Sequence, residues 1–149
     1  MMKILVDADA CPVKSEIIKV AKDFNLEVIM YIDRSHELSY EDIKVFTVDK
    51  GIDSVDLVIV NSMKERDVVI TQDYGLADLV LSKKGYAIHQ NGYEYTKENI
   101  QRLLFERHIS KKKRNAGIYG KGPKKRKQSD NEKFEKFLRD FLEKMELNT

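Results

Sequence analysis

The 149-residue chain has one cysteine, no tryptophan, two prolines and seven glycines. A single cysteine excludes an internal disulfide framework and a zinc site made of four cysteines. No apolar run approaches the length of about 20 residues that a membrane-spanning helix requires. The chain begins with a short apolar run and shows no secretory pattern. We therefore expect a soluble protein of the cytoplasm that has no part in a membrane.

Acidic residues are absent from one long segment near the C-terminus. Residues 108–128 contain nine Lys and Arg and no Asp or Glu, whereas residues 1–107 contain 14 basic against 19 acidic residues. The net charge of +2 conceals this separation. An acidic body joined to a concentrated basic segment indicates an anionic partner, held next to a site that needs cations.

Short apolar runs alternate with segments of helical periodicity along most of the chain. A chain of this length, 42% hydrophobic and 35% charged, fits one domain, spanning 1–149, with a substantial core and a highly charged surface. The alternation predicts an α/β fold of three layers, α/β/α, with a mostly parallel central sheet. The predicted strands are residues 4–6, 27–32, 44–48, 68–71 and 86–88.

The helices are predicted from caps and apolar spacing. Ser54 is a suitable N-cap for a helix through Val55–Met63, although that stretch is rich in β-branched residues. Thr96 is expected to cap a long helix that ends near residue 112, followed by a flexible, glycine-rich basic loop at about 111–128. The pattern Ser129–Glu132 fits a capping box for an amphipathic terminal helix at about 130–147. Its apolar stripe would pack on the domain or on a second copy in a homodimer.

Two of the apolar runs end in carboxylates. Asp7 follows Ile4–Val6, and Asp73 follows Val68–Thr71. Ligands and catalytic groups of open α/β sheets collect just beyond the carboxyl ends of the strands, so we expect Asp7 and Asp73 to approach one point. Asp9, Asp56 and Asp78 could extend this group. These acids and Asp73 also have structural interpretations. Asp9 and Asp73 could cap helices, and Asp56 and Asp78 could be favourable charges near a helix N-terminus.

Clustered carboxylates suit a hard divalent cation. Mg²⁺ and Mn²⁺ prefer oxygen ligands, retain several waters and also bind phosphate oxygens. A metal at such a cluster would polarise a phosphoryl group and supply hydroxide for phosphodiester cleavage. The pattern Asp7-Ala-Asp9 also permits a phosphohydrolase of the haloacid-dehalogenase type, in which Asp7 would be the nucleophile.

Three motifs resemble the YaiI/YqxD family of bacterial proteins. They are VDADACPVK at 6–14, DVVITQDYGLADLVLSKKG at 67–85 and GPKKRKQSDNEKFEKFL at 122–138. The resemblance implies a fold like that of the PIN-like nuclease domains, whose strand-end acids bind Mg²⁺ or Mn²⁺. It makes Asp7 the acid of the first strand, Asp73 that of the later strand and Asp56 the intermediate acid, with Asp53 as a competitor. Cys11-Pro12 is peculiar to the YaiI/YqxD pattern, and a further glutamate of many PIN domains has no counterpart.

The basic segment predicts a nucleic-acid contact. Its cations would neutralise backbone phosphates without reading bases, although a solvated loop is the alternative. These residues are Lys111, Lys112, Lys113, Arg114, Lys121, Lys124, Lys125, Arg126 and Lys127. The three histidines lack metal-ligand spacing, and Cys11 is expected to be a small buried side chain.

Together these patterns predict a metal-dependent phosphodiesterase acting on RNA or single-stranded nucleic acid, with Asp7 and Asp73 as catalytic metal ligands. Asp9, Asp56 and Asp78 would give further metal ligation or support. The alternatives are a binding module without catalysis that keeps a nuclease-like fold, and the phosphohydrolase that uses Asp7 as its nucleophile.

Overall fold

The computed structural model describes residues 2–33, 40, 42–49, 54–120 and 124–148. Six strands form one sheet in the order β3-β2-β1-β4-β5-β6. They are β1 (Lys3–Asp7), β2 (Glu27–Asp33), β3 (Lys44–Val48), β4 (Val68–Ile70), β5 (Tyr86–His89) and β6 (Tyr93–Tyr95). The first five are parallel, and β6 is antiparallel to β5. The predicted α/β class with a mostly parallel sheet is therefore confirmed, and the arrangement is compatible with a PIN-like fold.

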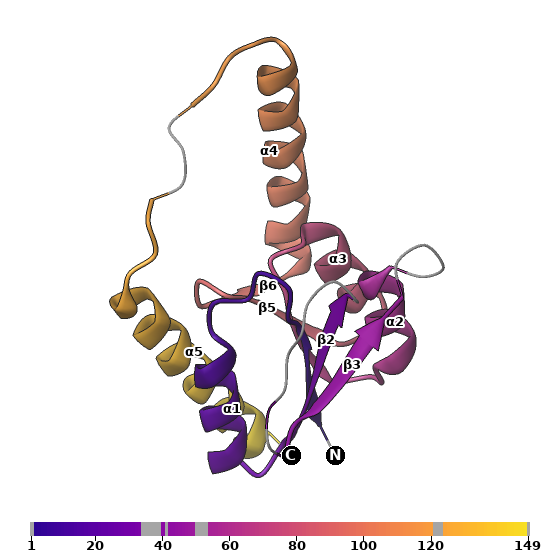
Figure 1. Ribbon diagram of the computed structural model, residues 1–149, viewed down its shortest axis with the longest axis vertical. Helices are drawn as coiled ribbons and strands as arrows, with labels where there is room; N and C mark the ends of the chain where they lie inside the picture. The colour runs from indigo at the N-terminus through magenta and orange to yellow at the C-terminus, as the bar shows by residue number, and fades with distance from the viewer. Residues whose placement is uncertain (1, 34–39, 41, 50–53, 121–123, 149) are drawn as a thin grey trace.

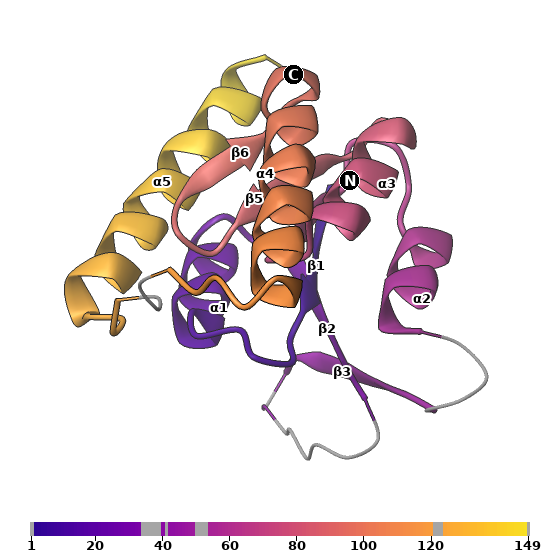
Figure 2. The ribbon, with the colours of Figure 1, turned by 90° about the horizontal axis from the view of Figure 1, so that it is seen from above.

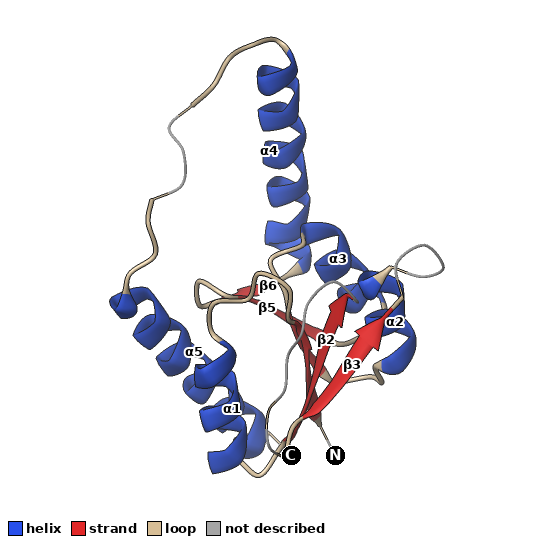
Figure 3. Ribbon diagram, viewed as in Figure 1, coloured by secondary structure: helices blue, strands red, loops and turns tan. Residues whose placement is uncertain are grey.

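Five helices cover the two faces of this sheet (Figures 1 and 3). They are α1 (Lys14–Asp23), α2 (Val55–Ser62), α3 (Tyr74–Ser82), α4 (Lys97–Asn115) and α5 (Gln128–Leu147). Helices α1 and α5 lie on one face, and α2, α3 and the start of α4 lie on the other (Figure 2). Among the described residues, none of these helices combines the length and apolarity needed to cross a membrane.

The core has two halves because side chains alternate between the faces of a strand. Ile4 and Val6 of β1 pack with α1 and α5, whereas Leu5 packs with α2 and α3. The terminal helix buries Phe134 and Leu138 against the sheet and α1, so its apolar stripe is used inside the chain.

Four sequence predictions differ from the structure. A sixth strand, β6, follows the turn at Asn91-Gly92, where Gly92 has a φ of +87°. Helix α4 continues to Asn115, so Lys111–Arg114 lie on a helix and not in a loop. Helix α5 begins at Gln128, before the predicted box at Ser129–Glu132, because Asp130 Oδ2 accepts the backbone N–H of Lys127 at 2.8 Å. Asp9 does not cap α1, whose N-cap Val13 makes no side-chain hydrogen bond.

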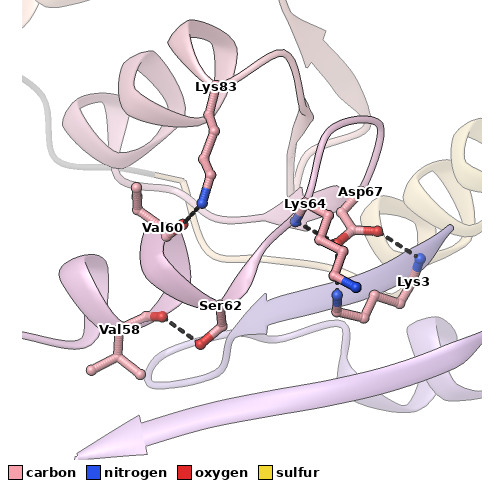
Figure 4. A network of polar contacts seen from close by, with 7 residues as sticks. All are labelled: Lys3, Val58, Val60, Ser62, Lys64, Asp67 and Lys83. Carbon is pink, nitrogen blue, oxygen red and sulfur yellow. Dashed lines mark hydrogen bonds and ion pairs between the residues drawn. The ribbon is translucent and has the colours of Figure 1, made fainter.

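A buried acid holds the amino ends of β1 and β4 together (Figure 4). Asp67 is 2% exposed and accepts the backbone N–H of Lys3 at 3.1 Å and that of Lys64 at 2.8 Å. Its Oδ2 also pairs with Lys3 Nζ at 2.8 Å. Its partners come from one strand and one turn and satisfy this carboxylate, so Asp67 is a structural residue at the end of the strands opposite the strand-end acids.

Candidate active site

Asp7 and Asp73 meet across two neighbouring strands. Asp7 is the last residue of β1, and Thr71 follows β4, which pairs with β1 in parallel. The Thr71 hydroxyl donates to Asp7 Oδ2 at 2.9 Å and accepts the backbone N–H of Asp73 at 2.9 Å. One buried hydroxyl therefore connects the two acids at the carboxyl edge of the sheet.

The Asp73 carboxylate has two structural partners on α3. Its Oδ1 accepts the backbone N–H groups of Gly75 at 2.8 Å and Leu76 at 3.3 Å, so Asp73 is the N-cap that one alternative predicted. The same oxygen lies 3.8 Å from Nη1 of Arg107 on α4. A capping role fixes the direction of this side chain.

Asp56 completes a cluster of three carboxylates with Asp7 and Asp73. It lies in the first turn of α2, which Ser54 caps by accepting the N–H of Leu57 at 3.3 Å. Burial raises the pKa of Asp56 to about 6, and the charge of Asp73, a side-chain hydrogen bond with Asp73 and the charge of Asp7 add to the shift. We call Asp7, Asp56 and Asp73 the carboxylate cluster.

The environment of Asp7 also disfavours its charge. Burial raises the pKa of Asp7 above its usual value, against the lowering effect of the Thr71 hydrogen bond, and the charges of Asp73 and Asp9 raise it further. Perturbed carboxylates that repel one another are common where a protein binds a cation or protonates a substrate.

Of the remaining predicted acids, Asp9 is near enough for its charge to raise the pKa of Asp7, and no described contact joins Asp78 to the cluster. Asp9 Oδ2 accepts the backbone N–H of Asp33 at 3.0 Å, which ties the loop after β1 to the end of β2. Asp78 lies in the second turn of α3, where its backbone carbonyl accepts the Ser82 hydroxyl at 3.1 Å. Asp53, the competitor of Asp56, lies outside the described residues.

The carboxylate cluster offers oxygen ligands for a metal ion. Among the described residues, no three His, Cys, Asp or Glu side chains are placed to hold a metal ion together. Mg²⁺, however, is commonly bound by one or two carboxylates together with retained waters and substrate phosphates. The carboxylate oxygens and the mutual repulsion of the cluster fit an ion held by two carboxylates and waters. They do not fit a site in which every metal ligand comes from the protein.

Cys11 and the described histidines are not part of the cluster. Cys11 is 7% exposed, and burial raises the pKa of its thiol, which suppresses the thiolate. His89 is buried and stacks on Tyr93 with 4.7 Å between ring centroids, while its Nδ1 accepts the N–H of Asn91 at 2.9 Å. His108 is exposed on α4, and His36 lies outside the described residues.

The basic residues fall into two groups. The exposed ones are Lys111, Lys112, Lys113 and Arg114 at the end of α4, and Lys124, Lys125 and Lys127 before α5. The end of α4 projects from the sheet on the side where the parallel strands end (Figure 1). Lys121 lies outside the described residues.

Arg126 differs from these exposed residues. Its guanidinium donates to Asn131 Oδ1 at 2.6 Å, Asn91 Oδ1 at 2.7 Å and the Gln90 carbonyl at 2.8 Å. Arg126 thus attaches the start of α5 to the turn between β5 and β6, a contact that a count of charges could not reveal.

Comparison with known proteins assigns the family. A family model described as "Uncharacterized BCR, YaiI/YqxD family" matches residues 5–144. The chain belongs to the YaiI/YqxD family. The resemblance carried by the three sequence motifs is thereby confirmed.

Relatives of similar length support this assignment. A "UPF0178 protein" of Clostridium tetani is 54% identical over 134 residues, which cover 89% of this chain and 90% of the relative. A protein of that name from Lachnoclostridium phytofermentans is 47% identical, with a match that covers 95% of this chain and 97% of the relative. Another from Natranaerobius thermophilus is 46% identical, and its match covers 97% of this chain and 98% of the relative. No solved structure gives a significant match.

Sequence reasoning missed two residues of this region. Thr71 carried a weak signal, since a polar residue follows the apolar run of β4. Arg107 carried none, because its ion pair with Asp73 spans 34 positions and depends on how α4 crosses α3.

Proposed function

We propose that the protein is a metal-dependent phosphodiesterase that acts on RNA or single-stranded nucleic acid. The observation that carries this proposal is the convergence of Asp7, Asp56 and Asp73 at the strand ends, with raised pKa values at Asp7 and Asp56. Such a cluster is costly without a cation, and an Mg²⁺ or Mn²⁺ ion would relieve the repulsion.

Each group has a role in this proposal. Asp7 and Asp73 would hold the ion, Asp56 would bind one of its waters, and Thr71 orients Asp7. When bound, the ion would polarise the phosphoryl oxygen and acidify a water. In the hydrolysis, water adds to phosphorus, the bond to the leaving oxygen breaks, and that oxygen takes up a proton. Asp9 and Asp78 are proposed to support the site from its edges.

The exposed cations would hold the nucleic-acid backbone. Lys111–Arg114 form one run on α4 in a segment that contains no acid, so phosphate binding meets no local repulsion. Contacts between these side chains and backbone phosphates would bind nucleic acid without recognising its base sequence. We do not assign Arg126 to this contact, because its donors are engaged within the protein.

Titration with Mn²⁺ tests the metal site. Calorimetry should show binding to the wild type and at least tenfold weaker binding to an Asp7→Asn/Asp73→Asn variant, because removing two ligand charges weakens an oxygen site strongly. The control is Glu98→Gln, another exposed first-turn acid, on α4. Equal Mn²⁺ binding by the wild type and the double variant would show that the site is elsewhere.

Cleavage of a labelled single-stranded RNA separates the alternatives. Metal-dependent cleavage that the double variant lacks supports the proposal. Salt-dependent RNA binding without turnover would instead indicate the binding module. The observation in favour of that alternative is that no three metal-ligating side chains of the described residues are placed to hold an ion together. Release of phosphate from a monoester, with trapping of Asp7, would indicate the phosphohydrolase.

A further inference from the structure

Arg107 lies where the apolar stripe of α4 ends. Ile100 is buried against the sheet, and Leu103 and Leu104 pack on the same core half. Spacings of three, four and seven residues put side chains on one face of a helix, so Arg107 continues the stripe of Ile100, Leu103 and Leu104. The face of α4 that packs on α3 therefore carries Arg107 one turn beyond Leu103 and Leu104, beside Asp73, the N-cap of α3.

The contact of Arg107 with the carboxylate cluster is electrostatic. Its Nη1 lies 3.8 Å from Asp73 Oδ1, which is too long for a hydrogen bond, and the side chain is 60% exposed. The same Asp73 oxygen is already held by two N–H groups of α3. The guanidinium therefore compensates charge without being fixed in place, and a long exposed side chain can turn away at small cost.

Arg107 is paired with the carboxylate cluster through Asp73. Among the ion pairs of the described residues, this is the one that reaches Asp7, Asp56 or Asp73. The start of α4 is held firmly: Thr96 and Asn99 form a capping box, and Asn99 Nδ2 donates to the Glu94 carbonyl at 2.9 Å. The helix backbone therefore places Arg107 beside Asp73, while its guanidinium remains exposed and is not hydrogen-bonded to that acid.

We propose that Arg107 has two alternating partners: it compensates Asp73 in the metal-free protein and binds a non-bridging oxygen of the scissile phosphate when a divalent ion occupies the cluster. This inference rests on the proposed phosphodiesterase function. Arginine suits both partners, because its planar donors match carboxylate and phosphate alike. The same group then opposes metal binding and assists the reaction that the metal supports.

The two roles predict opposite effects of one substitution. Arg107→Gln removes a cation that competes with the metal, so Mn²⁺ affinity should rise about threefold, as expected for an exposed ion pair. Cleavage of single-stranded RNA at saturating Mn²⁺ should fall by a factor on the order of 100, the usual loss when one stabilising donor is removed from a reacting centre. A side chain that only supports the fold would not strengthen metal binding.

Arg102→Gln is the matched control. Arg102 is also an exposed arginine of α4 that lies 3.8 Å from a carboxylate, and that carboxylate belongs to Glu106 and not to the cluster. This variant should keep the Mn²⁺ affinity and the cleavage rate of the wild type. Arg107→Lys keeps the charge, so its Mn²⁺ affinity should match the wild type while its cleavage rate lies between those of wild type and Arg107→Gln.

The outcomes separate this inference from the proposed function. Metal-dependent cleavage by the wild type, with Arg107→Gln equal to Arg102→Gln in both Mn²⁺ affinity and rate, would refute the role of Arg107 alone. A parallel loss of Mn²⁺ affinity and rate in Arg107→Gln would also refute it, because it would indicate a supporting role. A wild type that neither binds Mn²⁺ nor cleaves RNA would refute both proposals.

Discussion

Asp56 should destabilise the metal-free protein at neutral pH. Its pKa is raised from 3.8 to about 6 by burial and by the charges of Asp73 and Asp7. A carboxyl group with a raised pKa binds protons more readily in the folded state, so the free energy of unfolding falls as pH rises from about 4 to 6. Above that window the full destabilisation is present.

The magnitude follows from the shift. Two pKa units correspond to at most about 3 kcal/mol, and partial exposure of Asp56 reduces this to roughly 1 kcal/mol after solvent screening. Asp56→Asn in EDTA at pH 7.5 should therefore raise the free energy of unfolding by about 0.5–1 kcal/mol, since the first-turn charge of α2 is also lost. The expected increase in Tm is about 1–4 °C.

Urea unfolding of the metal-free protein at pH 7.5 and at pH 4 measures this effect. The gain of Asp56→Asn should disappear at pH 4, where the wild-type carboxyl is protonated. Glu98→Gln, which removes the exposed first-turn acid of α4, should show only a small loss at pH 7.5. A loss of stability in Asp56→Asn at pH 7.5, or a gain that persists unchanged at pH 4, would refute the account of repulsion in the cluster.

Four further measurements follow from the structure. Asp67→Ala should lower the free energy of unfolding by roughly 3 kcal/mol, because Lys3 Nζ and two backbone N–H groups lose their acceptor. Urea unfolding measures this loss, and a value below about 1 kcal/mol would contradict the structural role of Asp67. The pKa of His89 is lowered to about 4 by burial and Arg126, so at this residue the unfolded state binds more protons between pH 4 and 6.5. The stability of His89→Phe relative to the wild type should therefore rise by about 1 kcal/mol per pH unit as the pH falls below 6, a difference in which the opposing contribution of Asp56 cancels. Thr71→Val should cost about 1–3 kcal/mol in thermal unfolding, because the Asp73 N–H loses its acceptor, whereas Thr71→Ser keeps the hydroxyl and should cost clearly less. Lys112→Gln/Lys113→Gln should reduce the salt slope of single-stranded RNA binding by about 1 to 1.5, and Lys22→Gln/Lys44→Gln, at exposed sites elsewhere, should leave it unchanged.

Local patterns predicted the part of the site that the sheet builds. Continuous apolar runs at Ile4–Val6 and Val68–Ile70 predict central strands, and parallel neighbours end at the same edge. The meeting of Asp7 and Asp73 follows from that geometry. The helix predicted through Val55–Met63, from the Ser54 cap and the strand that follows closely, is observed at Val55–Ser62 despite its β-branched composition.

Contacts between residues far apart in the sequence could not be predicted from local sequence patterns. Asp67 and Arg107 each contact residues more than 30 positions away, and no spacing rule covers such pairs. Helix α5 begins two residues before the predicted start because Asp130 caps it locally at Lys127, and the contact of Arg126 with the β5–β6 turn is the tertiary detail that local pattern could not give. Strand β6 is different: Asn91-Gly92 is a known hairpin signal that the sequence reading did not use.

The contrast between Asp67 and the carboxylate cluster is informative about function. The two lie at opposite ends of the same strands, yet Asp67 is satisfied by an ammonium and two N–H groups, whereas in the described part of the chain the cluster is paired with one exposed guanidinium. The chain can therefore neutralise a buried acid where stability requires it. Leaving three acids under-compensated at the carboxyl edge costs stability, and such costs are usual at sites that bind a ligand. This asymmetry within one sheet is why we expect the missing positive charge to come from a bound cation.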